Sequence, residues 1–159
     1  MEVILLWLFL ILGLVLLCIS FKKPHLKDWL LCYLTAAYFA AFLGELVVYY
    51  QMLSYPVRLF PLFQSSVLYE HLLLPLVCIY YYQSSYNKGI LTCLLKALLY
   101  SSVLAAFEIL LEKNTDLIHY ISWYWYYSLT SLFLFLLLVR SLMWLMDDIT
   151  GKRENSSGS

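Results

Sequence analysis

Hydrophobic positions along this chain fall in long continuous runs, and short polar segments separate one run from the next. The runs cover residues 3–20, 29–49, 67–82, 90–111 and 121–146. Most are close to the ~20 apolar residues that a helix needs to cross the ~30 Å hydrocarbon core of a bilayer. They lack the ~10-residue alternation of apolar and polar side chains that marks a membrane β-barrel. The pattern therefore predicts an all-α integral membrane bundle of five transmembrane helices.

Composition agrees with this prediction. The chain has 159 residues, of which 64% are hydrophobic and 13% charged, and its formal net charge is zero. Soluble domains are about half apolar and about 25% charged, so this chain has too few polar residues to cover a water-facing surface. The expected partner is the lipid bilayer, and the neutral charge argues against nucleic acid. We expect residues 1–146 to form one membrane domain and residues 147–159 a polar, disordered tail. The sequence identifies no cofactor and no protein partner.

The distribution of basic residues predicts the orientation of the bundle. With five spans, eight basic residues fall at one side of the membrane: Lys22, Lys23, Lys27, Lys88, Lys96, Arg140, Lys152 and Arg153. The other side has only Arg58 and Lys113. Because loops rich in Lys and Arg stay in the cytoplasm, we expect a multi-pass plasma-membrane protein with the N-terminus outside and the C-terminus cytoplasmic.

Three carboxylates interrupt the apolar runs. Glu45, Glu70 and Glu108 each lie inside a predicted span, where an ionisable group costs about 2.5 to 3.5 kcal/mol. The alternating direction of the helices brings all three toward the outer leaflet, and Glu112 follows Glu108 on the same helix face. Three separate helices thus place acid at one level. The sequence therefore predicts an acid-lined polar site near the outer leaflet that binds a cation, a metal or a small ligand.

Other residues join this site in the predicted topology. Arg58, in loop 51–65, is the expected counter-charge, and His71 directly follows Glu70. The aromatic segment 120–127 is a candidate lid over the acids. The candidate ligand-binding residues are Glu45, Arg58, Glu70, His71, Glu108, Glu112, Trp123 and Trp125. If the ligand is a metal, Glu70, His71 and Glu108 are the candidate ligands, since carboxylate and imidazole suit hard and borderline ions.

Two local features predict how the helices around the site pack. Ala36, Ala40 and Gly44 recur at four-residue spacing, and such small residues let helices approach closely. Pro75 has no N–H to donate to the carbonyl of His71, so a freed carbonyl and a kink are expected beside Glu70.

The same acids admit other roles. A charge-paired network would only hold the helices together, and the chain would then act as a structural or partner subunit. A Glu/His set can also ligate zinc and activate water, as in a membrane-embedded metal-assisted hydrolase. No HExxH motif is present and no substrate or nucleophile can be identified. The sequence therefore favours a non-enzymatic protein over an enzyme.

Three segments carry a family resemblance: YPVRLFP at 55–61, LYEHLLLPL at 68–76, and FEILLEKNTDLIHYISWYWYYS at 107–128. They resemble a family of small uncharacterised multi-pass integral membrane proteins of spore-forming Gram-positive bacteria. The matching positions are Arg58, Pro61, Glu70, Pro75, Glu108, Glu112, Trp123 and Trp125. The resemblance implies a multi-helix fold in a bacterial plasma membrane and implies no activity.

Overall fold

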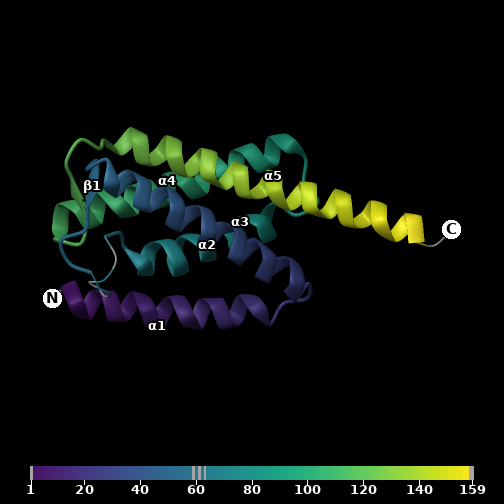
Figure 1. The fold of residues 1–159 in the computed structure, drawn as a ribbon, viewed down its shortest axis with the longest axis horizontal. Coiled ribbons are helices and arrows are strands. Elements are labelled where there is room, and N and C mark those ends of the chain that lie inside the picture. Colours follow the sequence, from purple (N-terminus) through teal and green to yellow (C-terminus); the bar gives the residue numbers. More distant parts are fainter. Residues whose placement is uncertain (1, 59, 61, 63, 158–159) are drawn as a thin grey trace.

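The chain folds almost entirely into helices (Figure 1). The structure, a computed structural model, describes residues 2–58, 60, 62 and 64–157. Pro61, one of the positions that carry the resemblance, lies outside the described residues. In chain order the elements are α1 (Glu2–Phe21), α2 (Leu26–Tyr49), β1 (Leu53–Ser54), η1 (Tyr69–Leu73), α3 (Leu74–Ser85), α4 (Ile90–Asn114), β2 (His119–Tyr120) and α5 (Trp125–Ser157).

Four of these helices are long and apolar enough to cross a membrane. They are α1, α2, α4 and the Trp125–Gly151 part of α5. A helix suits this environment because all of its interior backbone N–H and C=O groups bond within the segment. The all-helical prediction is confirmed. The five-span count is not supported by these four helices, because run 67–82 folds as the π-helical turn η1 followed by the short helix α3.

The helices lie roughly side by side, with the α1–α2 and α3–α4 turns at one end of the bundle (Figure 1). The N-terminus and strand β1 lie at the other end. A contact at this end agrees with this arrangement, since the ammonium of Lys23, in the α1–α2 turn, donates to Oε1 of Gln83, near the end of α3, at 2.8 Å. The same ammonium lies 5.5 Å from the centre of the Tyr80 ring. We call these ends the turn end and the strand end.

Small residues on α2 allow the close packing that the sequence predicts. Ala36 and Ala40 are buried in the main core, together with Ile79 of α3 and Leu136 of α5. Gly44 lies one turn beyond Ala40, against the side chain of Glu70. The four-residue spacing therefore forms a groove on α2 in which η1 and α3 pack.

The helix changes its hydrogen bonding immediately before Pro75. In η1 the Leu74 N–H bonds to the Tyr69 carbonyl, five residues back, as in a π-helical turn. Pro75 leaves the His71 carbonyl without its helical donor, and the hydroxyl of Tyr33 on α2 donates to it instead. The predicted freed carbonyl is confirmed, and a neighbouring helix satisfies it.

A Tyr33→Phe variant is expected to lose about 0.5 to 2 kcal/mol of stability, because the His71 carbonyl then has no donor. Thermal unfolding of the detergent-purified protein measures this loss. Tyr38→Phe is the matched control, since Tyr38 is on the same helix and 70% exposed. Equal melting temperatures for the two variants would count against the Tyr33 bond as a stabilising contact.

A two-stranded sheet joins two loops at the strand end. Leu53 pairs with Tyr120 and Ser54 with His119 in antiparallel register. The pairing connects the segment after α2 with the segment before α5. Helix α5 consequently begins at Trp125, four residues after the predicted start of the fifth run.

Helix α5 also continues to Ser157, through most of the segment that we expected to be a disordered tail. Residues 147–157 contain no proline and only Gly151 among the helix-breaking residue types. Near the start of this extension, Asp147 accepts a hydrogen bond from Tyr82 of α3 at 3.0 Å. This contact and the local sequence favour continuation of the helix past Met146.

Candidate functional site

A cavity of about 110 Å³ lies near the strand end, between α2, η1, α4 and α5. It is large enough to hold several water molecules. Its polar lining consists of Glu70, Glu108, Tyr55, Tyr69, Trp123, Ser128 and Ser131. Apolar side chains such as Leu43 and Phe135 form the rest of the wall. We call it the acid cavity.

Glu70 is the more deeply buried of its two carboxylates, with 3% of the residue exposed. Its Oε2 receives a hydrogen bond from the Ser65 hydroxyl at 2.7 Å. Its Oε1 is buried and has no hydrogen-bond partner among the described residues. This oxygen also lies against the backbone of α2, because a Cβ added at Gly44 would stand only 1.7 Å from it. Gly44 therefore provides the space that the carboxylate occupies.

Ser65 connects this buried acid to an exposed one. Its hydroxyl lies 2.8 Å from Glu45 Oε1 as well as 2.7 Å from Glu70 Oε2. A hydroxyl has one hydrogen to donate, and an ionised carboxylate can only accept. Separate two-centre hydrogen bonds to both acids require that one of the two carboxyl groups carries a proton. Glu45, Ser65 and Glu70 thus form a chain from the protein surface to the acid cavity, which we call the serine bridge.

Glu108 enters the cavity from α4 and is 8% exposed. The Tyr69 hydroxyl donates a hydrogen bond to its Oε1. The hydroxyl of Ser128, near the start of α5, lines the same cavity and accepts a hydrogen bond from the Trp123 indole at 2.7 Å. The hydrogen bond from Tyr69 ties η1 to α4.

The loops beside the cavity carry two tyrosines whose pKa values are affected by the nearby acids. Burial raises the pKa of the Tyr55 hydroxyl above its usual value, and the nearby Glu108 and Glu70 carboxylates raise this pKa further. Burial likewise raises the pKa of Tyr120, where Glu108 and Glu112 add to the effect and a hydrogen bond to Ser128 opposes it. Both phenols therefore stay neutral and do not neutralise the acids.

The two candidate tryptophans have different surroundings. Trp123 lines the cavity, and its indole N–H donates to Ser128 Oγ at 2.7 Å. Trp125 is 58% exposed, packs against Tyr126 and does not line the cavity. The aromatic segment thus contributes one wall residue, whereas Trp125 and its neighbours face outward.

The remaining candidates lie outside the cavity. His71 is exposed, Glu112 and Arg58 are half-buried, and none of the three lines the acid cavity. Glu45 reaches it only through the serine bridge. Within the described part of the chain, no group of three or more His, Cys, Asp or Glu side chains is placed to hold a metal ion. Glu70, His71 and Glu108 are therefore not gathered into the metal site that the sequence suggested.

The described lining includes two carboxylates and no lysine, arginine or histidine. A cavity of this kind attracts positive charge, and its unpartnered Glu70 oxygen offers an acceptor. Sequence reasoning missed Tyr55, Ser65, Tyr69 and Ser128 as members of the site. Tyr55, Ser65 and Tyr69 belong to the polar and aromatic stretch 55–75 that surrounds Glu70 in the sequence, which was the available signal.

By fold, the chain belongs to the class of all-helical proteins with several helices of membrane-spanning length. No protein family matches the chain, and no curated protein or solved structure matches it. The resemblance to a membrane-protein family of spore-forming bacteria therefore stays a prediction.

Proposed function

We propose that this chain is a multi-pass plasma-membrane protein that binds a small monovalent cation in the acid cavity. The observation that carries the proposal is the buried Oε1 of Glu70, which has no partner in the described part of the chain and belongs to a carboxylate lining the cavity. A buried acceptor without a partner is costly, and a bound ammonium group or hydrated ion would satisfy it.

The lining favours a small organic ammonium ion over a divalent metal. Two carboxylates supply charge, while Tyr55, Tyr69 and Trp123 supply aromatic surface, which attracts organic cations. Zn²⁺ prefers four N, S or O ligands, and the described residues offer no group of three such side chains. The volume of about 110 Å³ suits an ion with a few heavy atoms, such as methylammonium.

The membrane arrangement is part of the same proposal. We place the turn end in the cytoplasm, because Lys22, Lys23 and Lys88 belong to its two turns and Lys27 lies at the start of α2. The N-terminus and the acid cavity then face outward. For a fifth crossing, η1 and α3 together serve as a short, well-buried span at the lower limit of ~17–25 residues. The family resemblance suggests a bacterial membrane.

Methylammonium is expected to raise the melting temperature of the detergent-purified protein, and Glu70→Gln is expected to abolish this rise. Binding stabilises the native state by about 2.7 kcal/mol at a ligand concentration 100 times Kd. Tetraethylammonium at equal concentration should not stabilise the protein, because it is too large for the cavity. The same melting experiment is done with Na⁺, K⁺, Mg²⁺ and Zn²⁺.

Glu112→Gln is the matched control for this experiment. It makes the same chemical change on α4 and does not alter the described cavity lining. We expect it to respond to methylammonium as the parent does. Equal responses of the parent and Glu70→Gln would refute binding at Glu70, and a response to Zn²⁺ alone that needs Glu70 would favour the metal alternative.

A second role is supported by the hydrogen bonds themselves. The bond from Tyr69 to Glu108, and the serine bridge, link separate segments of the bundle. If no cation stabilises the parent, and Glu70→Gln only lowers its melting temperature, the acids serve as helix-joining groups. The function would then have to be sought in a partner.

A further inference from the structure

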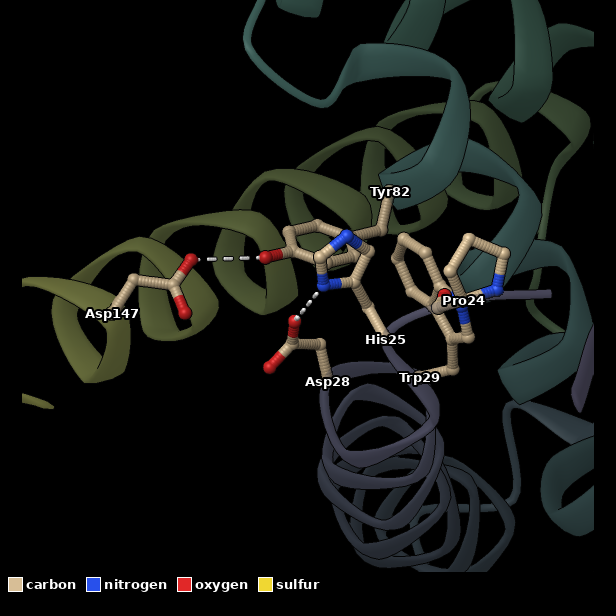
Figure 2. Close-up of polar contacts among 6 residues, drawn as sticks. All are labelled: Pro24, His25, Asp28, Trp29, Tyr82 and Asp147. Carbon is tan, nitrogen blue, oxygen red and sulfur yellow. Dashed lines mark hydrogen bonds and ion pairs between the residues drawn. The ribbon is translucent and has the colours of Figure 1, made fainter.

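A second, open pocket of about 610 Å³ lies at the turn end, remote from the acid cavity. The start of α2, the α3–α4 turn and α5 surround it. Figure 2 shows side chains of this region, with Asp28 and Trp29 of α2 near Tyr82 of α3 and Asp147 of α5. Its volume is within the ~300–1,000 Å³ of ordinary ligand pockets. We call it the turn-end pocket.

Arg140 is the main cationic group of this pocket. Its guanidinium lies over the Tyr82 ring, 4.8 Å from the centre, and donates to the Ser85 carbonyl at 3.2 Å. Among the described residues, no carboxylate forms an ion pair with it. A guanidinium has five N–H donors, so several stay available for an anion. Lys88, on the turn between α3 and α4, adds a second positive charge.

Two carboxylates balance these charges. Asp147 Oδ2 accepts a hydrogen bond from the Tyr82 hydroxyl at 3.0 Å (Figure 2). Asp28 Oδ2 lies 3.8 Å from Nδ1 of His25 (Figure 2). These contacts use one oxygen of each aspartate. Among the described residues, the pocket therefore combines two acidic and two basic side chains, and this part of its lining has no net formal charge. A ligand that carries both signs of charge suits such a lining better than an anion or a cation alone.

We infer that the turn-end pocket binds the headgroup of a phospholipid with a primary amine, of the phosphatidylethanolamine type. Arg140 and Lys88 bind the phosphate, because guanidinium and ammonium groups form charge-assisted hydrogen bonds to its oxygens. Asp28 and Asp147 accept hydrogen bonds from the primary ammonium. A choline headgroup has no N–H to donate, and an anionic glycerol headgroup brings no cation to the aspartates.

The exposed apolar surface beside the pocket argues for a lipid as the source of this headgroup. Trp144 is 64% exposed and Leu31 is 41% exposed, and both line the pocket. Tryptophan is typical of the membrane–water interface, where headgroups lie. Acyl chains attached to a headgroup in the pocket would extend along these side chains on the outside of α2 and α5.

The experiment is native mass spectrometry of the full chain with three lipids of identical acyl chains. Their headgroups are phosphoethanolamine, phosphocholine and phosphoglycerol. We expect the ethanolamine lipid to bind at least about tenfold more tightly than either of the others, since it alone pairs with both charges. Similar binding of all three lipids, or tightest binding of the glycerol lipid, would overturn the inference.

Three variants assign the headgroup to the pocket. Lys88→Gln changes an exposed residue and is expected to weaken ethanolamine-lipid binding without affecting folding. Asp147→Asn keeps an acceptor for the Tyr82 hydroxyl but removes the charge, so preference should shift toward the glycerol lipid. Lys27→Gln is the control, because Lys27 is exposed at the same end and does not line the pocket. Unchanged selectivity in Asp147→Asn would contradict the inference.

Arg140→Gln is expected to lose ethanolamine-lipid binding by about tenfold or more, and Arg140→Lys is expected to retain part of it. A melting curve without added lipid separates this loss from misfolding. Soluble glycerophosphoethanolamine tests the source of the headgroup. If it binds as tightly as the lipid, a free phosphate ester and not a lipid is the ligand, and the lipid assignment fails.

Discussion

Gly44→Ala is expected to destabilise the protein by roughly 1 to 3 kcal/mol and to disrupt the acid cavity. The added methyl group would stand 1.7 Å from Oε1 of Glu70 and 3.2 Å from its Cγ, so the side chain has to move. Movement of Glu70 breaks its contact with Ser65, because that bond fixes Oε2 at 2.7 Å. Thermal unfolding measures the stability loss, and methylammonium titration measures the loss of the site.

The stability change caused by Gly44→Ala is expected to reverse its sign when the side chain of Glu70 is shortened. In a Glu70→Ala background the new methyl group meets no carboxylate, and alanine is a better helix former than glycine by about 1 kcal/mol. Gly44→Ala should then be neutral or stabilising. A double-mutant cycle gives the coupling between the two positions directly.

Gly151→Ala is the matched control, because Gly151 is also inside a helix and its added Cβ meets nothing within 4 Å. We expect it to leave the melting temperature unchanged or slightly higher. If Gly44→Ala behaves like Gly151→Ala in the parent background, Glu70 does not occupy the space beside Gly44, and the cavity geometry is wrong.

The positions of the helices could be predicted because each apolar run is long and ends at polar residues. The direction in which each side chain points was harder to predict. In a membrane helix the faces toward lipid and toward the bundle are both apolar, so periodicity does not separate them. Glu45 was for this reason grouped with Glu70 and Glu108, although the structure leaves Glu45 exposed and the other two buried.

Two kinds of site residue escaped the sequence analysis for physical reasons. Aromatic residues near span ends are typical of the interface, so Tyr55 and Tyr69 gave no separate signal for a cavity. The two-residue strands at Leu53–Ser54 and His119–Tyr120 are too short for any alternation to be visible. Their pairing helps to set the position of the loops beside the cavity.

The Pro75 inference succeeded because it rested on covalent chemistry and not on periodicity. A proline lacks an N–H wherever it occurs, so the His71 carbonyl had to find another donor or stay unsatisfied. The sequence could not identify Tyr33 as that donor, since this depends on how α2 packs against η1. The same limit applies to Ser65, whose partners on α2 and η1 become visible only in three dimensions.

The serine bridge is expected to hold a proton that infrared spectroscopy can detect. At neutral pH the parent is expected to show the infrared C=O stretching band of a protonated carboxylic acid. Ser65 Oγ lies within hydrogen-bond distance of both Glu45 and Glu70, and its single hydrogen satisfies only one of them. We expect the other carboxyl to donate its own hydrogen to Ser65, in place of a three-centre bond that shares the serine hydrogen. One proton is thereby held between an exposed and a buried acid.

Either Glu45→Gln or Glu70→Gln is expected to remove this band. A glutamine amide donates to Ser65 Oγ, and the remaining carboxylate then accepts the serine hydrogen without being protonated. Ser65→Ala is expected to shift the band to higher frequency and to cost about 1 to 3 kcal/mol, because the buried Glu70 loses its hydrogen-bond donor. Infrared spectra and unfolding curves of the same preparations measure both effects.

Ser131→Ala is the matched control for Ser65→Ala. Ser131 also lines the cavity, but its hydroxyl donates to the backbone carbonyl of Ser128 and contacts neither acid of the bridge. The infrared C=O band of Ser131→Ala should match that of the parent. Two results would contradict a shared proton: a parent spectrum without the band, or a band that persists in both glutamine variants and disappears in Glu108→Gln. In the second case Glu108 is the protonated group, and the cation proposed for the cavity would be held by Glu70 alone.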